Sequence, residues 1–151
     1  MSVAFLEELE TYVTSIRRSL PKIGPGNPFR FSEASSLNDR VWQGDLGITI
    51  TNTIPADFVK VDKVTNKHLQ LVPGNTIGSK HCLTTSVGVE LWVPPVFNDE
   101  SLIGPCIKCL QDTSIEHPTH GTVTIPAGFM IQCTYQRNLD QIQKVEIRAR
   151  D

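Results

Sequence analysis

Apolar side chains recur with two different spacings along the chain, and the change between them divides it into two parts. In residues 2–20 they return every three or four positions, which is the period of an amphipathic helix with one buried face. Pro21 ends this predicted helix, and residues 21–28, five of which are Pro or Gly, are typical of a linker. We therefore predict an N-terminal helix over residues 1–20, a Pro/Gly linker over 21–28, and a different structure from residue 29 onward.

The second part, residues 29–151, consists of short alternating runs separated by turn residues. Runs such as 46–51 and 87–93 place apolar side chains at every second position, as strands with one buried face do. Long helical patterns do not occur in this part of the sequence. We expect a mainly β domain, a small antiparallel β-barrel or a sandwich, which together with the N-terminal amphipathic helix makes a single globular domain.

Two segments near the C-terminus carry more specific expectations. Residues 122–125 and 129–135 predict a hairpin, and the alternation in its second strand turns Cys133 toward the core, where a free thiol behaves as a small hydrophobe. In residues 138–151 the apolar spacings fit a helix or a strand, and a short helix is preferred.

Composition and charge exclude several classes of function. The chain has 151 residues, with 14 Lys and Arg against 16 Asp and Glu, for a net charge of −2, so no basic field drives nucleic-acid binding. Three glutamates among the first ten residues interrupt any signal peptide, and no apolar run approaches the ~18 residues of a membrane span. We expect a soluble cytoplasmic protein that binds neither nucleic acid nor membrane, with its four cysteines reduced.

The stretch His117-Pro118-Thr119-His120 is the most informative for chemistry. With Pro118 at the second position of a β-turn, the first and fourth residues approach within about 7 Å, so both imidazoles can reach one ion. Two imidazoles alone make a weak site, because zinc prefers four ligands and catalytic sites usually take three from the protein.

Two alternatives supply further ligands. In one, Cys106 and Cys109 join His117 and His120 in a Cys2His2 site, although bulky residues follow each cysteine, and two ordinary thiols, one facing in and one out, are favoured instead. In the other, a glycine-rich loop delivers His81, and three imidazoles with an open position bind Zn²⁺ or another first-row divalent metal. A third interpretation keeps all three histidines at surface turns without metal.

Short motifs in the same order resemble a group of small uncharacterised bacterial and phage β proteins. They are a QGD opening at residues 43–45, a glycine-bearing segment 74–81 that ends in histidine, the H-x-x-H turn at 117–120, and a segment 134–138 before a closing Arg-Ala-Arg-Asp. The resemblance implies that His81, His117 and His120 form one constellation. Ser79 stands where that group often has a further histidine, which leaves any metal site one ligand poorer.

No reaction follows from the sequence. The chain has no G-x-S-x-G nucleophile motif and no Walker or dinucleotide-binding glycine pattern. The first hypothesis is a metal-binding β protein that uses His81, His117 and His120. The alternative is a non-catalytic adaptor, in which the apolar face of the predicted helix at residues 2–20 docks on a protein partner or on a second copy of the chain.

Overall fold

The computed structural model describes residues 28–73, 80–98, 101–140 and 145–148 of the chain. The predicted helix at residues 1–20 and all but the last residue of the predicted linker lie outside them. In the described part of the chain, no helix is long and apolar enough to cross a membrane.

Short strands make up almost all the regular structure, as the alternating sequence predicts. The strands are β1 (Phe29–Arg30), β2 (Arg40–Gln43), β3 (Leu46–Thr51), β4 (Val59–Lys60), β5 (Cys82–Leu83), β6 (Val89–Val93), β7 (Ile103–Cys109), β8 (Thr113–His117), β9 (Gly121–Ile125), β10 (Met130–Tyr135), β11 (Arg137–Asp140) and β12 (Val145–Arg148). One 3₁₀ turn, η1 (Asn66–His68), lies between β4 and β5. The expectation of a mainly β fold is confirmed.

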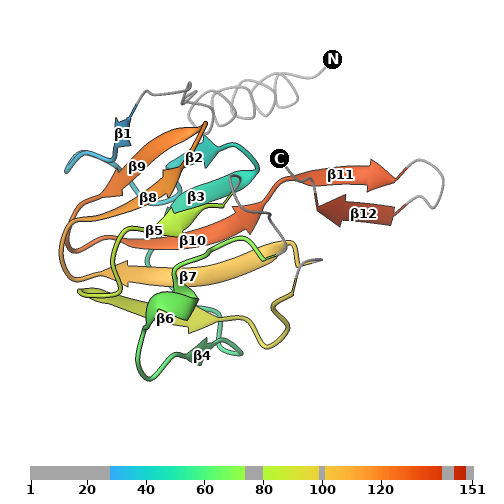
Figure 1. Cartoon of the computed structure of the whole chain (residues 1–151), viewed down its shortest axis with the longest axis horizontal. Coiled ribbons are helices and arrows are strands. Elements are labelled where there is room, and N and C mark those ends of the chain that lie inside the picture. The colour runs from blue at the N-terminus through green and yellow to red at the C-terminus, as the bar shows by residue number, and fades with distance from the viewer. Residues whose placement is uncertain (1–27, 74–79, 99–100, 141–144, 149–151) are drawn as a thin grey trace, which may run out of the picture.

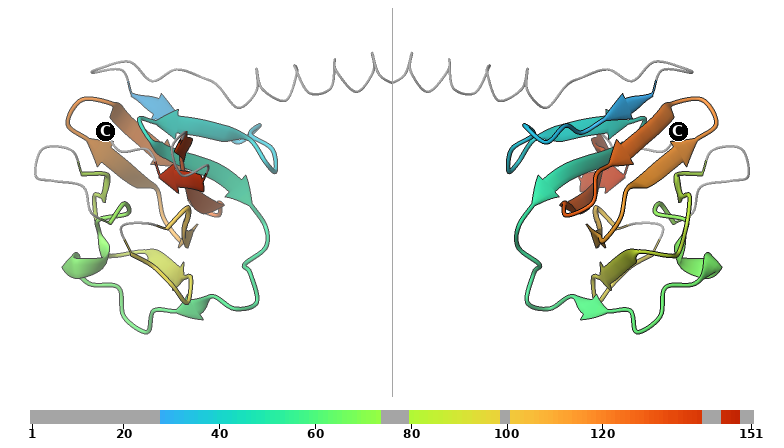
Figure 2. Two further views of the ribbon diagram at one scale, coloured as in Figure 1. Left: turned by 90° about the vertical axis from the view of Figure 1, so that its right-hand side faces the viewer. Right: turned by 90° about the vertical axis from the view of Figure 1, so that its left-hand side faces the viewer.

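The strands form two open sheets and a small separate one (Figures 1 and 2). The larger sheet has the order β2-β3-β10-β7-β6-β4, and the smaller has the order β1-β9-β8-β5. All pairs within them are antiparallel except β1 with β9. The described strands do not close on themselves, so the barrel alternative is wrong and the two-sheet alternative describes the fold.

Alternation along each strand builds the core between the sheets. In the six-stranded sheet, directly opposed residues of one row all face inward: Ile50, Ile131, Ile107 and Leu91. Ile115, Val123 and Ile125 of the smaller sheet belong to the same buried cluster. Cys133 is fully buried among these residues, which confirms its predicted place in the core. Removing this apolar surface from water is the main favourable term in the folding of such a domain.

Two local predictions were wrong. Residues 122–125 and 129–135 form β9 and β10, but these strands belong to different sheets, so the turn at Pro126 to Phe129 leads from one sheet to the other instead of closing a hairpin. The segment expected to favour a short helix near the C-terminus contains β11 and β12, which pair antiparallel and extend from the body as a hairpin (Figure 1). Strand pairing decided both cases, and the spacing of apolar residues within one segment does not show which strand it pairs with.

Candidate functional site

Three histidines from two segments, His81 and the turn that holds His117 and His120, meet where the two sheets face each other. The ring centroids of His81 and His117 are 4.4 Å apart, those of His117 and His120 are also 4.4 Å apart, and those of His81 and His120 are 6.4 Å apart. His81 is fully buried and His117 is only 6% exposed, whereas His120 is half-buried. The structure thus brings the three predicted residues together, and metal binding by them stays a prediction.

The hairpin of β2 and β3 brings a buried amide and a buried carboxyl group to the same place. Gln43 ends β2 and faces inward opposite Leu46, and only Gly44 and Asp45 lie between the paired residues. Gly44 has a positive φ of 58°, which a glycine at the first position of a tight two-residue hairpin supplies without strain. This turn allows Gln43 and Asp45 to approach His81 together.

Hydrogen bonds engage both ring nitrogens of His81. Its Nδ1 lies 2.8 Å from Oε1 of Gln43, and its Nε2 lies 2.9 Å from Oδ1 of Asp45. The amide nitrogen of Gln43 donates to two backbone carbonyl groups of the smaller sheet, those of Ile115 at 2.9 Å and Gly121 at 2.7 Å. Only the nitrogen of an amide donates, so the oxygen of Gln43 accepts, and Nδ1 of His81 carries the proton.

The proton on Nδ1 of His81 limits what can lie between its Nε2 and Oδ1 of Asp45. With Nδ1 protonated, Nε2 of a neutral ring has a lone pair directed at the carboxyl group. A lone pair and a carboxylate oxygen at 2.9 Å repel each other unless a cation lies between them. The two atoms therefore either share a proton in a hydrogen bond or bind one metal ion.

The turn that carries the other two histidines differs slightly from the predicted one. His117 ends β8 opposite Gly121, so the loop has three residues, and His120 lies in the loop instead of on a strand. Gly121 has a φ of 80°, as three-residue hairpin loops with a left-handed residue require. Nδ1 of His117 accepts hydrogen bonds from the backbone N–H groups of Thr119 at 3.1 Å and His120 at 3.2 Å. Its proton is therefore on Nε2 in this arrangement.

The cysteines are not brought to the histidines. Cys106 and Cys109 lie on β7 of the larger sheet, with Cys109 facing the core and Cys106 facing away, where its thiol donates to Oε1 of Gln132 at 2.9 Å. Because Cys106 is on the outer face of the sheet, the sheet itself separates its thiol from the three rings. The two thiols do point to opposite faces, as predicted, but both are fully buried.

Burial suppresses the chemistry of all four thiols, each of which is free of disulfide bonds. Removal from water raises the pKa of the Cys106 thiol to about 11 and that of the Cys109 thiol to about 11. The same cause raises the pKa of Cys133 further and, to a smaller degree, that of Cys82, which is half-buried. None of these thiols is an activated nucleophile.

Sequence reasoning missed Gln43 and Asp45 as site residues, although it singled out the QGD motif that contains them. The signal in the sequence was that two polar residues, Gln43 and Asp45, flank Gly44 in a stretch whose other residues are typical of a buried strand. The fourth histidine, His68, lies outside the cluster: it ends η1, where its Nδ1 accepts from the backbone N–H of Thr65 at 2.9 Å.

Within the described residues, no group of three or more His, Cys, Asp or Glu side chains has the geometry of a formed metal site. Asp45 and His81 are aimed at a common point, whereas His117 directs its lone pair at the backbone of its own turn. The cluster therefore has two ligand atoms that point at one position, Nε2 of His81 and Oδ1 of Asp45, and two further imidazoles beside them.

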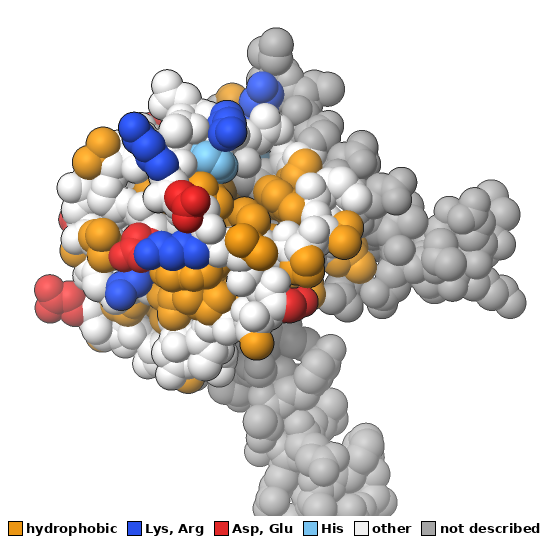
Figure 3. All heavy atoms as spheres, turned by 90° about the horizontal axis from the view of Figure 1, so that it is seen from below, with side chains coloured by type: hydrophobic (Ala, Val, Ile, Leu, Met, Phe, Trp, Pro, Cys, Tyr) orange, Lys and Arg blue, Asp and Glu red, His pale blue; other side chains and the backbone are white. Residues whose placement is uncertain are grey.

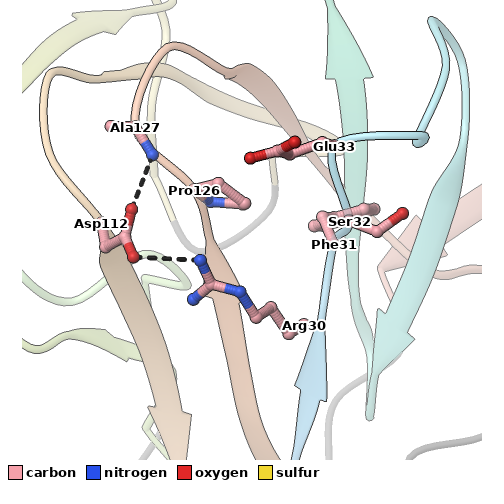
Figure 4. Close-up of a pocket in the computed structure, with 7 residues that line it drawn as sticks. All are labelled: Arg30, Phe31, Ser32, Glu33, Asp112, Pro126 and Ala127. Atoms are coloured by element: carbon pink, nitrogen blue, oxygen red, sulfur yellow. Dashed lines mark hydrogen bonds and ion pairs between the residues drawn. The ribbon is translucent and has the colours of Figure 1, made fainter.

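A separate surface pocket of about 470 Å³ lies between β1 and the two turns that follow β7 and β9 (Figure 4). Asp112 accepts there from the guanidinium of Arg30 at 3.0 Å and from the backbone N–H of Ala127 at 2.9 Å. These two bonds, with that of Ala127 first, lower the pKa of Asp112. More than half of each charged side chain is exposed, so this pair fastens the turns rather than forming a reactive centre.

Residues 42–135 match the model of a family described as Domain of unknown function (DUF8820). The chain belongs to this family. The matched region begins one residue before Gln43 and ends at Tyr135, so it contains Asp45 and the three histidines of the cluster. No curated protein and no solved structure matches the chain.

Proposed function

We propose that this DUF8820 protein binds a first-row divalent metal ion through Asp45, His81 and the adjacent imidazoles of His117 and His120. The observation that carries the proposal is the 2.9 Å approach of Nε2 of His81 to Oδ1 of Asp45, with the tautomer of His81 set by Gln43. A proton or a metal ion has to lie between these two atoms, and mixed imidazole and carboxylate donors suit zinc and its first-row neighbours.

The presence of two more imidazoles supports a metal rather than a proton alone. A proton needs only the two atoms that share it, whereas a metal ion needs three or four donors. Imidazoles bound to a tetrahedral ion at about 2.0–2.1 Å have ring centroids roughly 5 Å apart. The three observed separations, 4.4, 4.4 and 6.4 Å, lie on both sides of that value.

Gln43 supports the proposal by its place behind the aimed ligand. A metal-binding histidine usually donates its other ring N–H to an acceptor that fixes the tautomer and the ring orientation. Oε1 of Gln43 is such an acceptor, and the bonds from its amide nitrogen to both Ile115 and Gly121 hold it in place. In this account Gln43 is a positioning residue and not a ligand.

Binding of a metal ion requires changes at two places in the cluster, the contact of His81 with Asp45 and the ring of His117. Nε2 of His81 and Oδ1 of Asp45 must separate by a few tenths of an ångström, because ligand atoms about 2 Å from one ion lie farther apart than hydrogen-bonded atoms. His117 must also lose the proton on Nε2 or turn its ring away from the N–H groups of Thr119 and His120.

Cobalt titration of the untagged, chelator-treated protein tests the proposal. We expect one equivalent of Co²⁺ to bind, with visible absorption of a low-coordinate ion and without the intense thiolate bands that cysteine ligands would give. His81→Ala and Asp45→Asn should abolish binding, and Gln43→Ala should weaken it by about 10- to 100-fold. His68→Ala, which removes a histidine outside the cluster, is the matched control and should bind as the wild type does.

Folding of the variants is checked by circular dichroism, and His120→Ala provides a variant at a half-buried position that tolerates change better than the buried ones. The proposal fails if the wild type takes up less than about 0.2 equivalents of cobalt and of zinc, because a formed site binds stoichiometrically. It also fails if folded His120→Ala and His81→Ala bind as tightly as the His68→Ala control.

A further inference from the structure

β11 and β12 form a ribbon that leaves the body of the domain at one place. β11 follows directly from β10, with only Gln136 between the two strands. The N–H of Gln136 donates to the carbonyl group of Asp45 at 2.9 Å, in the turn that joins β2 to β3. Beyond this bond, β11 and β12 pair with each other and with no other described strand (Figure 1). The end of β10 thus continues into a ribbon of two strands.

A ribbon of two short strands is marginally stable in water, because it needs a third strand or a packed face for independent stability. β11 and β12 have four residues each. Among the described strands, β12 pairs on one side only, so the backbone groups of its other edge can receive a further strand. The match to the family model ends at Tyr135, so the ribbon lies outside the region that contains the proposed metal ligands.

The pairing register of the ribbon sets two like charges opposite each other. Arg137 of β11 is directly opposite Arg148 of β12, and Leu139 is directly opposite Glu146. Like charges in directly opposed positions destabilise an antiparallel pair, whereas opposite charges stabilise it. Neither charged residue of β12 therefore has an opposite charge across from it in β11. A third strand would improve the ribbon if it placed a carboxylate beside Arg148 and a cation beside Glu146.

A second copy of β12 has the sequence that meets this requirement. β12 reads Val-Glu-Ile-Arg, so Glu146 and Arg148 lie on either side of Ile147. When two copies pair antiparallel with Ile147 opposite Ile147, Glu146 of each copy is opposite Arg148 of the other. Registers centred on Glu146 or on Arg148 oppose like charges instead. An edge strand with charges of a single sign would repel its own copy, and β12 has one charge of each sign.

The body of the domain offers a second copy less than the ribbon does. On the side of β4 and β6, hydrophobic side chains lie among Lys, Arg, Asp and Glu side chains (Figure 3). The ammonium of Lys60 is 2.7 Å from the carboxylate of Glu90 there, and 5.4 Å from the centroid of the Trp92 ring. This cation has its partners within one molecule, whereas the register of the ribbon opposes two cations.

We propose that the chain forms a two-fold dimer through β12, in which two ribbons join into one antiparallel sheet with the strand order β11-β12-β12-β11. Two-fold symmetry makes each copy contribute the same residues, so the pair of Glu146 with Arg148 occurs twice. Each pair of opposed arginines then has a carboxylate beside it. The joined sheet has four strands, which is more than the third strand that a single ribbon lacks.

Sedimentation velocity of the whole, chelator-treated chain over a range of concentrations tests the proposal. We expect a reversible equilibrium between monomer and dimer, with a dissociation constant of roughly 1–100 µM, because four residues from each copy make an interface below the standard size. Added salt should weaken the dimer, since it screens charge pairs at an exposed edge.

Charge reversal at the two positions tests the register. Glu146→Arg and Arg148→Glu should each raise the dissociation constant at least about tenfold, because each variant turns two attractive pairs into two repulsive ones. Arg148→Glu also places opposite charges across the ribbon at Arg137, so its effect cannot come from a weakened ribbon. The double variant restores both pairs in reverse order and should dimerise within about threefold of the wild type.

Glu33→Arg, the same change of charge at an exposed position of the body, is the matched control and should dimerise as the wild type does. Circular dichroism checks that the variants are folded. The proposal is overturned if the chain stays monomeric up to about 0.5 mM, if the folded single variants dimerise as tightly as Glu33→Arg, or if the double variant does not recover. His120→Ala should dimerise normally, which separates this test from that of the metal site.

Discussion

Oε1 of Gln43 lies 2.8 Å from Nδ1 of His81, and this contact joins one sheet to the centre of the candidate site. The same side chain donates to the carbonyl groups of Ile115 and Gly121, which belong to β8 and β9. One fully buried amide therefore connects the larger sheet, the smaller sheet and the histidine. Structure and chemistry depend here on the same residue.

Replacing Gln43 by Ala should destabilise the domain by about 2–4 kcal/mol, because the carbonyl groups of Ile115 and Gly121 and the ring N–H of His81 each lose a partner. Urea unfolding followed by circular dichroism measures the change. Gln111→Ala is the matched control, since its amide donates to a single carbonyl, that of Val87, at the exposed surface. A loss no larger than that of the control would show that Gln43 does not join the sheets.

Gly104→Ala and Gly128→Ala should differ sharply. A Cβ at Gly104 would meet the buried ring of Tyr135, whose hydroxyl donates to the carbonyl of Leu71 at 2.6 Å, so we expect a loss of roughly 3 kcal/mol from overpacking. A Cβ at Gly128 meets nothing within 4 Å, and only its φ of 94° opposes the change, at a cost of about 1 kcal/mol. Equal losses in thermal or urea unfolding would contradict this packing.

Thiol reactivity should follow burial. In the folded protein at pH 8, only Cys82 should react with a thiol reagent, and slowly, because burial raises the pKa of all four thiols. A pKa of about 11 leaves roughly one Cys106 thiol in a thousand ionised at that pH. Counting the modified cysteines by mass spectrometry before and after addition of urea tests this. Rapid labelling of Cys106 or Cys109 in the native protein would be inconsistent with the structure.

The same pKa values predict how stability changes in alkaline solution. Below the unfolded value of 9.0 the thiols are protonated in both states, so they make stability independent of pH. From about pH 9 to 11 the thiols ionise in the unfolded chain while those of Cys106 and Cys109 remain protonated in the fold, and the free energy of unfolding should fall. Substituting Ser for Cys109 should flatten part of this decline.

Local signals in the sequence predicted the β class, the inward orientation of Cys133 and a turn that brings His117 and His120 close together. They did not reveal that β9 and β10 belong to different sheets, because the same alternation serves a hairpin and a crossover. They also did not show that the last strands pair with each other. The meeting of Asp45 with His81 joins segments 36 residues apart, and such a contact depends on strand order, which no local period encodes.

The structure was needed to distinguish the proposed metal ligands, Asp45 and the histidines, from the proposed positioning residue, Gln43. Histidines are easy to single out as candidate metal ligands, because the sequence has only four of them. A glutamine and an aspartate beside a glycine are ordinary turn residues, and only their burial gives them a role. The alignment of Arg40 with Lys60 on the outer face of the six-stranded sheet also could not be predicted from the sequence, because five separate strand pairings determine it.

Anomalous diffraction at the zinc edge, from crystals of the untagged protein grown with zinc, tests the central claim most directly. We predict one strong peak within about 2.3 Å of both Nε2 of His81 and Oδ1 of Asp45, with at least one more imidazole bound. The two atoms should then lie farther apart than the 2.9 Å of the hydrogen-bonded pair. An absent peak, or one at the cysteines or at His68, with the His81 and Asp45 contact unchanged, would contradict the account.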